Sequence, residues 1–426
     1  MSGRKKIVVI GAGPAGIAAG LALGEEAVVL DSAEDPGGLS RTLKIDGAVV
    51  DLGGHSFHTP HAEVRKLVFG ALEMSEQRRD ARCFVKGTMI PYPFQANFQE
   101  IGDRVLTQEC ARGWENRESR TSPRDFPEYL QSKFGEGICR HFLLPYNQKL
   151  WGGNLQRLSA DWAGERVADA AEFREKTQAE KAKRTPLKST TRVAYPAQGG
   201  FGEIYRALAA GLADLRLGKT VEQIDSRRRQ VVLEGGEAIA AHEIISTIPL
   251  DRLLKITSDC PPDLCEEVDR LEKLSLAFVV AVIDHPVDTP VQRIYCADDT
   301  SPAHKIALNH SSSDSLRLLP RHGIVAEVSY SPHKPLSASQ LEEQVIDGLL
   351  AMGAIDSPAV VRTTKTIRVE YGYPVPTHER DRIVERARVW LQSRGIHTVG
   401  RFGEWAYINS DEALYRGMRL GEKLAN

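Results

Sequence analysis

Three glycines near the start of the chain have the spacing of a dinucleotide-binding turn. Gly11, Gly13 and Gly16 follow a run of β-branched residues at 7–10 and lead into an Ala/Leu-rich segment. Gly11 permits a tight turn from a strand into a helix, and Gly13 lets a pyrophosphate approach the bare backbone. Gly16 lets the helix pack closely on the strand. These residues therefore predict that backbone N–H groups bind a diphosphate.

The helix and the strand that follow complete the pattern. Pro14 and Ala15 begin the predicted helix, whose unpaired N–H groups and partial positive charge would face the phosphates. A second apolar run at 27–30 ends on Asp31, about 20 residues after Gly11, where a carboxylate can accept from a ribose hydroxyl. This order favours a nucleotide-binding βαβ unit over an ordinary glycine-rich turn.

Two later turns offer further backbone groups to the same ligand. The first follows Pro36, and the residues that can present successive donors to phosphate are Gly38, Leu39, Ser40 and Arg41. In the second turn, Gly53 and Gly54 allow a flat ligand to approach the backbone closely. Asp46–Gly47 and Lys86–Gly87 predict hairpin turns, while residues 61–80 predict a helix.

Composition and charge argue against several classes of protein. The 426 residues contain 55 Lys plus Arg against 57 Asp plus Glu, which leaves no basic footprint for nucleic acid or an anionic membrane. No apolar run approaches the roughly 18 residues that span a bilayer, and a strand follows "MSGRKK" where a signal peptide would lie. The six cysteines lack CxxC or metal-ligand spacing. We expect a cytoplasmic enzyme with reduced thiols, no metal, and neither nucleic acid nor membrane as a partner.

Four later sequence blocks carry a resemblance to a known family. They are "GGHSFH" (53–58), "IPYPFQ" (90–95), "PYNQKLW…DWAGERVA" (145–168) and "YPAQGGFGEIY" (195–205). Together with the "GGLSRT" turn, they resemble the UDP-galactopyranose mutase family, and its eukaryotic-type branch more than its short bacterial one. That family lies within the FAD-dependent amine oxidase and glutathione-reductase-like class. "YGYPVPT" (371–377) and "GRFGEWAY" (400–407) extend the resemblance to nearly the whole chain.

The resemblance implies an α/β fold in which a Rossmann-like FAD-binding domain carries a helical insertion and a mixed or antiparallel substrate sheet. The expected segments are the first part of the FAD-binding domain with the start of the substrate sheet (1–96), the helical insertion (97–188), the second part of the FAD-binding domain (189–270), the substrate sheet (271–395) and a flavin-contacting C-terminal segment (396–426).

The resemblance also implies an isomerase chemistry that uses a flavin without net redox change. FAD is first reduced by NADH or NADPH, and its N5 then attacks the anomeric carbon of a nucleotide sugar. The N5–sugar adduct opens and recloses in the other ring size. The expected function is thus an FAD-dependent NDP-hexose mutase that interconverts pyranose and furanose forms. A net redox flavin oxidase or dehydrogenase of an amine or a sugar is the alternative. The nucleotide, the hexose and the oligomeric state stay open.

Three residues carry the expected catalytic roles. Arg166, in "GERVA", matches the arginine that grips the substrate diphosphate. Lys305 lies where the family has a second diphosphate arginine, so it keeps the charge but loses the bidentate geometry. His55 should lie against the flavin, and the resemblance allows either a backbone contact to N5 or a general base titrating near neutrality.

The remaining expected contacts lie in the same blocks. The substrate-binding set is Phe57, Tyr92, Gln95, Asn147, Trp151, Arg166, Tyr295, Lys305, His310, Tyr373 and Tyr407. To the cofactor-binding glycine turns, the resemblance adds His55, Val221, Gly400, Arg401, Asn409, Ser410 and Asp411. His310 replaces a diphosphate-contacting tyrosine, and Thr190 replaces an asparagine. These departures favour a modified sugar nucleotide, such as a deoxy or amino sugar.

Overall fold

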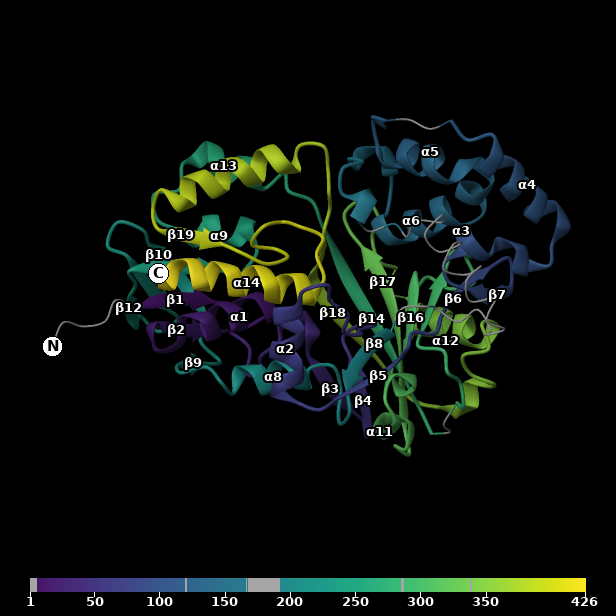
Figure 1. Ribbon diagram of the computed structural model, residues 1–426, viewed down its shortest axis with the longest axis horizontal. Coiled ribbons are helices and arrows are strands. Elements are labelled where there is room, and N and C mark those ends of the chain that lie inside the picture. The colour runs from purple at the N-terminus through teal and green to yellow at the C-terminus, as the bar shows by residue number, and fades with distance from the viewer. Residues whose placement is uncertain (1–5, 119–120, 166, 168–191, 285–286, 338) are drawn as a thin grey trace.

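The computed structural model describes residues 6–118, 121–165, 167, 192–284, 287–337 and 339–426, and it is built around two sheets (Figure 1). The predicted Arg166 and Thr190 lie outside the described residues. No helix within the described ranges is long and apolar enough to cross a membrane.

The first sheet is parallel and holds the predicted βαβ unit. Its strands, in spatial order, are β19 (Ile396–Thr398), β13 (Glu243–Ser246), β1 (Ile7–Ile10), β2 (Ala27–Leu30) and β9 (Leu215–Arg216). Both faces of β1 are covered, so all four of its residues are buried, as expected of a central parallel strand. Helices α1 (Pro14–Leu23) and α14 (Ser410–Ala425) pack together on one face (Figure 1).

The second sheet is mixed. Its order is β18 (Val361–Pro374), β14 (Lys273–Ile283), β17 (His322–Tyr330), β16 (Lys305–Leu308), β15 (Arg293–Cys296), β6 (Ala81–Val85) and β7 (Thr88–Pro91). Neighbouring strands are antiparallel except for β15 and β6, which are parallel. An early hairpin, β6–β7, thus extends a sheet built mainly from the far half of the chain.

Helices cover both faces of this second sheet. The group that includes α3 (Phe94–Asn97), α4 (Arg104–Glu115), α5 (Phe126–Ile138) and α6 (Leu144–Trp151) packs on one face around a shared apolar core. The Asp103 carboxylate caps α4 by accepting from the backbone N–H groups of Val105 and Leu106. Helix α12 (Leu341–Ala351) lies over the other face. These helices and the parallel sheet flank the second sheet in Figure 1.

Smaller elements lie between these strands along the chain. They are β3 (Thr42–Ile45), β4 (Ala48–Asp51), α2 (Ala62–Ala71), β5 (Met74–Arg78), β8 (Arg192–Pro196), α8 (Glu203–Ala209), β10 (Val221–Asp225), β11 (Gln230–Leu233), β12 (Ala238–Ala240), α9 (Leu250–Ile256), α10 (Pro262–Val268), α11 (Asp314–Arg317) and α13 (Arg380–Gln392). Helix α13 packs on α9, α10 and β19, beside the parallel sheet, although it falls within the segment 271–395.

One predicted element is wrong. Residues 61–80 were expected to form a helix throughout, but α2 ends at Ala71 and residues 74–78 form strand β5. Strand β5 pairs antiparallel with β8, from Met74 opposite Pro196 to Arg78 opposite Arg192. The polar sequence "MSEQR" has no strong strand preference of its own, so pairing with a distant segment decides its conformation.

Candidate functional site

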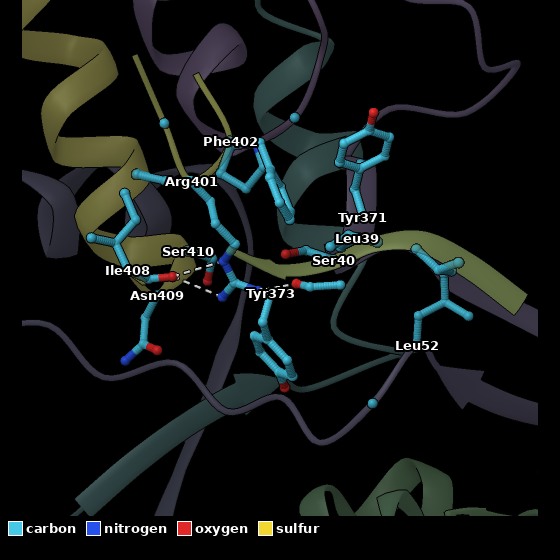
Figure 2. A pocket seen from close by; sticks show the side chains of 18 of the residues that line it. Leu39, Ser40, Leu52, Tyr371, Tyr373, Arg401, Phe402, Ile408, Asn409 and Ser410 are labelled. Carbon is cyan, nitrogen blue, oxygen red and sulfur yellow. Dashed lines mark hydrogen bonds between the residues drawn. The ribbon is translucent and has the colours of Figure 1, made fainter. Parts of the chain in front are cut away.

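A cavity of about 1290 Å³ lies between the two sheets. One end lies at the glycine turn after β1, and the other lies over the second sheet. We call the second part the tyrosine end, and define it by the lining residues Arg79, Tyr92, Tyr146, Tyr295, Lys305, Tyr373 and Tyr407. Figure 2 shows part of the cavity, where the Arg401 guanidinium lies beside Tyr373.

The glycine turn has the geometry that the sequence predicts. Gly11 adopts φ +103°, a conformation that side chains rarely allow. A Cβ atom at Gly16 would overlap the backbone carbonyl of Gly11, so Gly16 packs the helix against the turn and does not line the cavity. A Cβ at Gly13 would meet no atom within 4 Å, because Gly13 faces the cavity.

Asp31 braces this turn. Its Oδ2 accepts from the backbone N–H of Ala12 at 2.6 Å, and its Oδ1 accepts from that of Ala33 at 2.8 Å. These bonds hold the end of β2 against the glycine turn, while the side chain still borders the cavity. The contact with a ribose hydroxyl stays a prediction.

Most residues predicted to bind the cofactor lie along this cavity. The lining includes Gly11, Gly13, Pro14, Ala15, Asp31, Gly38, Leu39, Ser40, Arg41, Gly53, Gly54, His55, Val221, Gly400, Arg401, Asn409, Ser410 and Asp411. Arg401 donates from Nε and Nη2 to the Ile408 carbonyl at 2.9 and 2.7 Å, as the dashed lines in Figure 2 show. The open space at Gly13 and the run of bare glycine backbone fit an elongated dinucleotide such as FAD.

His55 lies where the two halves of the cavity meet. Its ring stacks on Phe201 with a centroid separation of 4.9 Å, and its carbonyl accepts from the buried Arg293 guanidinium. Burial, together with the nearby Lys305 and Arg293 charges, lowers the pKa of His55 to about 3. The imidazole is therefore neutral at physiological pH, which disagrees with a general base that titrates near neutrality.

Six of the residues predicted to bind substrate line the cavity, and four do not. Phe57, Tyr92, Tyr295, Lys305, Tyr373 and Tyr407 are among its lining residues. Gln95, Asn147, Trp151 and His310 are not. Asn147 Nδ2 donates to the Leu143 carbonyl within its own helix. Trp151 is fully buried and packs its ring edge-on against Tyr407, with centroids 5.4 Å apart. Trp151 thus supports a lining ring without reaching the cavity itself.

His310 is not among the residues that line the cavity. It follows β16 and stacks on His322, with ring centroids 4.0 Å apart and both residues buried. His322 is the first residue of β17, so the ring of His310 packs against the beginning of that strand. This position does not support the predicted substrate contact.

Comparison with known proteins identifies the family. A model of flavin-containing amine oxidoreductases matches residues 14–377. The chain belongs to this family. Among solved structures, reduced UDP-galactopyranose mutase is 28% identical, covers 99% of this chain and 93% of its own, and superposes with a TM-score of 0.90. This similarity confirms the resemblance seen in the sequence, and the family supports FAD as the cofactor.

More distant solved structures also match. Putrescine oxidase bound to putrescine superposes with a TM-score of 0.67 at 17% identity, covering 99% of this chain and 98% of its own. A fatty acid isomerase from P. acnes gives 0.66 at 13% identity, with the same coverages. At these identities the likeness shows the fold alone.

Sequence analysis missed several charged residues of the site. Arg79, Arg293, His304 and Glu327 all line the cavity. Glu327 had a recognisable signal, because it is the one acid within "GIVAEV", an apolar run that is typical of a buried strand. Arg79 had none, since it lies in the segment that was expected to be helical.

Glu327 is the centre of a buried polar network. Its Oε2 lies 2.5 Å from Lys305 Nζ, and its Oε1 accepts from the Tyr373 hydroxyl at 2.6 Å. Burial opposes ionisation of this carboxyl, but the charge of Lys305 and the His304 side chain, whose Nε2 lies 3.6 Å from Oε1, hold its pKa well below the usual range. Glu327 and Lys305 face each other directly across β17 and β16. The pair is therefore fixed by strand register.

Acid should destabilise the protein through His310. Burial lowers its pKa to about 3, so the folded chain keeps it neutral while the unfolded chain protonates it below its ordinary pKa. More protons on the unfolded state mean that stability falls as the pH falls. Between pH 7 and 5.5 we expect this residue to contribute a loss of about 1 kcal/mol.

The His310→Phe variant should lose less stability over that range than the wild type, as measured by urea unfolding at the two pH values. His333→Asn provides a control, because the side chain of His333 is 57% exposed. A His310→Phe protein with the same acid dependence as the wild type would remove His310 as a source of the effect.

Proposed function

We propose that this flavoenzyme is an NDP-hexose mutase that interconverts the pyranose and furanose forms of a sugar nucleotide. The observation that carries the proposal is the whole-chain likeness to reduced UDP-galactopyranose mutase, with a TM-score of 0.90. The putrescine oxidase that would favour a net redox reaction reaches only 0.67. The alternative of a flavin oxidase or dehydrogenase is therefore less well supported.

The cavity offers room for a second ligand beside the cofactor. Its volume of about 1290 Å³ exceeds the roughly 300–1,000 Å³ of a typical ligand site, and it continues past Gly53 and Gly54 to the tyrosine end. Aromatic rings and hydroxyls at that end suit a nucleobase, a sugar and phosphate oxygens. We propose that a nucleotide sugar, modified in its hexose, binds there.

Different residues of the chain then have separate roles beside the cofactor and the substrate. Reduced FAD, with NADH or NADPH as the proposed reductant, supplies a nucleophilic nitrogen at the sugar's anomeric carbon. Gly53 and Gly54 present bare backbone to the cavity, and a Cβ would crowd Glu327 at Gly53 and Arg293 at Gly54. Neutral His55 presents its ring and backbone there without a charge. The Tyr373 hydroxyl donates to Glu327, and the ring lies beside Arg401, whose guanidinium carbon is 5.4 Å from the ring centroid.

Dependence on the redox state tests this function. With UDP-galactopyranose and related sugar nucleotides as substrates, activity should appear only after dithionite or NAD(P)H reduces the flavin. Each turnover should consume no oxidant, and chromatography should show an isomer of equal mass. Turnover by the oxidised enzyme with stoichiometric hydrogen peroxide would establish the oxidase alternative instead.

A further inference from the structure

Two described cations lie at the tyrosine end, and a carboxylate neutralises only one of them. Lys305 Nζ lies 2.5 Å from Glu327 Oε2 and 3.5 Å from the Tyr373 hydroxyl. The Glu327 side chain is 2% exposed and that of Lys305 is 15% exposed, so water screens their attraction weakly. A phosphate that approached Lys305 would also meet the charge of Glu327.

Arg79 has no such partner. It directly follows β5, and its Nη2 donates to the Tyr295 hydroxyl. Within the described part of the chain, no carboxylate oxygen lies within 4.0 Å of its guanidinium, and Nε is buried without a hydrogen-bond acceptor. The guanidinium carbon lies 5.2 Å from the ring centroid of Tyr92 and 6.0 Å from that of Tyr295. Arg79 is thus a positioned charge in an aromatic frame.

Among the described residues, two other cavity arginines without a carboxylate partner already donate to backbone carbonyls. Arg293 donates to the carbonyls of Gln292 and His55. Arg401 donates to those of Ile408 and Gly372. Arg293 lies against Gly54 and His55, and the Arg401 guanidinium lies beside Tyr373 with the Ile408 carbonyl as its acceptor. Arg79 is the described cation that combines a position at the tyrosine end with an uncompensated charge.

We propose that Arg79, rather than Lys305, is the cation from this side of the cavity that binds the diphosphate of the substrate; this rests on the proposed nucleotide-sugar function. A guanidinium presents a planar set of donors that matches two phosphate oxygens, which an ammonium does not. Tyr92 and Tyr295 hold that plane in place before the ligand arrives. The Lys305–Glu327 pair instead contributes a neutral polar contact beside Tyr373.

Nucleotide titrations of the oxidised holoenzyme test the assignment. UDP and uridine serve as probes, because the difference between their affinities measures the contribution of the diphosphate to binding. Arg79→Gln should weaken the affinity for UDP by roughly 10-fold or more while changing the affinity for uridine by less than about 3-fold. Arg79→Lys, which keeps the charge, should lose less of the affinity for UDP than Arg79→Gln does. The double variant Lys305→Met/Glu327→Gln removes both charges together and should change UDP affinity by less than about 3-fold.

FAD content by absorbance, equal to wild type, shows that each variant is folded. If the double variant loses UDP affinity while Arg79→Gln retains it, the assignment of Arg79 is wrong and Lys305 binds the diphosphate. If the wild-type holoenzyme binds no UDP while FAD is fully loaded, the proposed nucleotide-sugar function fails, and the assignment of Arg79 with it.

Discussion

Replacing Glu327 by alanine is expected to lower the free energy of unfolding by about 3–5 kcal/mol, because the change leaves the Lys305 ammonium in a buried site without its counter-charge. The same change removes the acceptor of the Tyr373 hydroxyl, which lies 2.6 Å away. A buried donor that loses its acceptor costs free energy as well. Urea unfolding followed by circular dichroism measures the loss.

Two controls separate the charge from the lost volume. The double variant Lys305→Met/Glu327→Leu removes both charges and restores apolar bulk, so it should recover most of the stability. Glu422→Ala breaks the exposed Arg419–Glu422 pair, whose side chains are 60% and 42% exposed, and should cost less than about 1 kcal/mol. If Glu327→Ala behaved like Glu422→Ala, the buried pair would have no special stabilising role.

Local sequence patterns predicted those parts of the fold that local geometry controls. The βαβ unit formed as expected because its glycines and apolar runs are adjacent in sequence. Both hairpins formed at the expected turns, since Asp46, Gly47, Lys86 and Gly87 all adopt positive φ.

Side-chain direction explains most of what the sequence did not predict about the site. The glycine turns present backbone, so their place on the cavity follows from local geometry alone. Asn147 and Trp151 belong to a sequence block of the family, but the packing of α6 turns them into the helical core. The Glu327–Lys305 pair depends on the register of β16 with β17, which no local pattern encodes.

The glycine turn itself provides the last prediction, from a pair of substitutions three residues apart. Gly16→Ala should destabilise the protein by about 3 kcal/mol or more, because its Cβ would overlap the Gly11 carbonyl and both atoms belong to fixed backbone. Gly13→Ala should change the stability of the apoprotein by less than about 1 kcal/mol. Gly13 has φ −76°, which alanine adopts freely, and there is open space where its Cβ would lie.

For cofactor binding, Gly13→Ala should be the variant with the larger effect. Gly13→Ala fills the space through which a pyrophosphate approaches the backbone, so the folded variant should retain much less FAD than the wild type. Absorbance of the purified protein measures FAD content, and urea unfolding of the apoproteins measures stability. A Gly13→Ala protein with full FAD content would show that the diphosphate of the cofactor does not lie against this turn. That outcome would contradict the diphosphate-binding role predicted for the glycine turn at Gly11, Gly13 and Gly16.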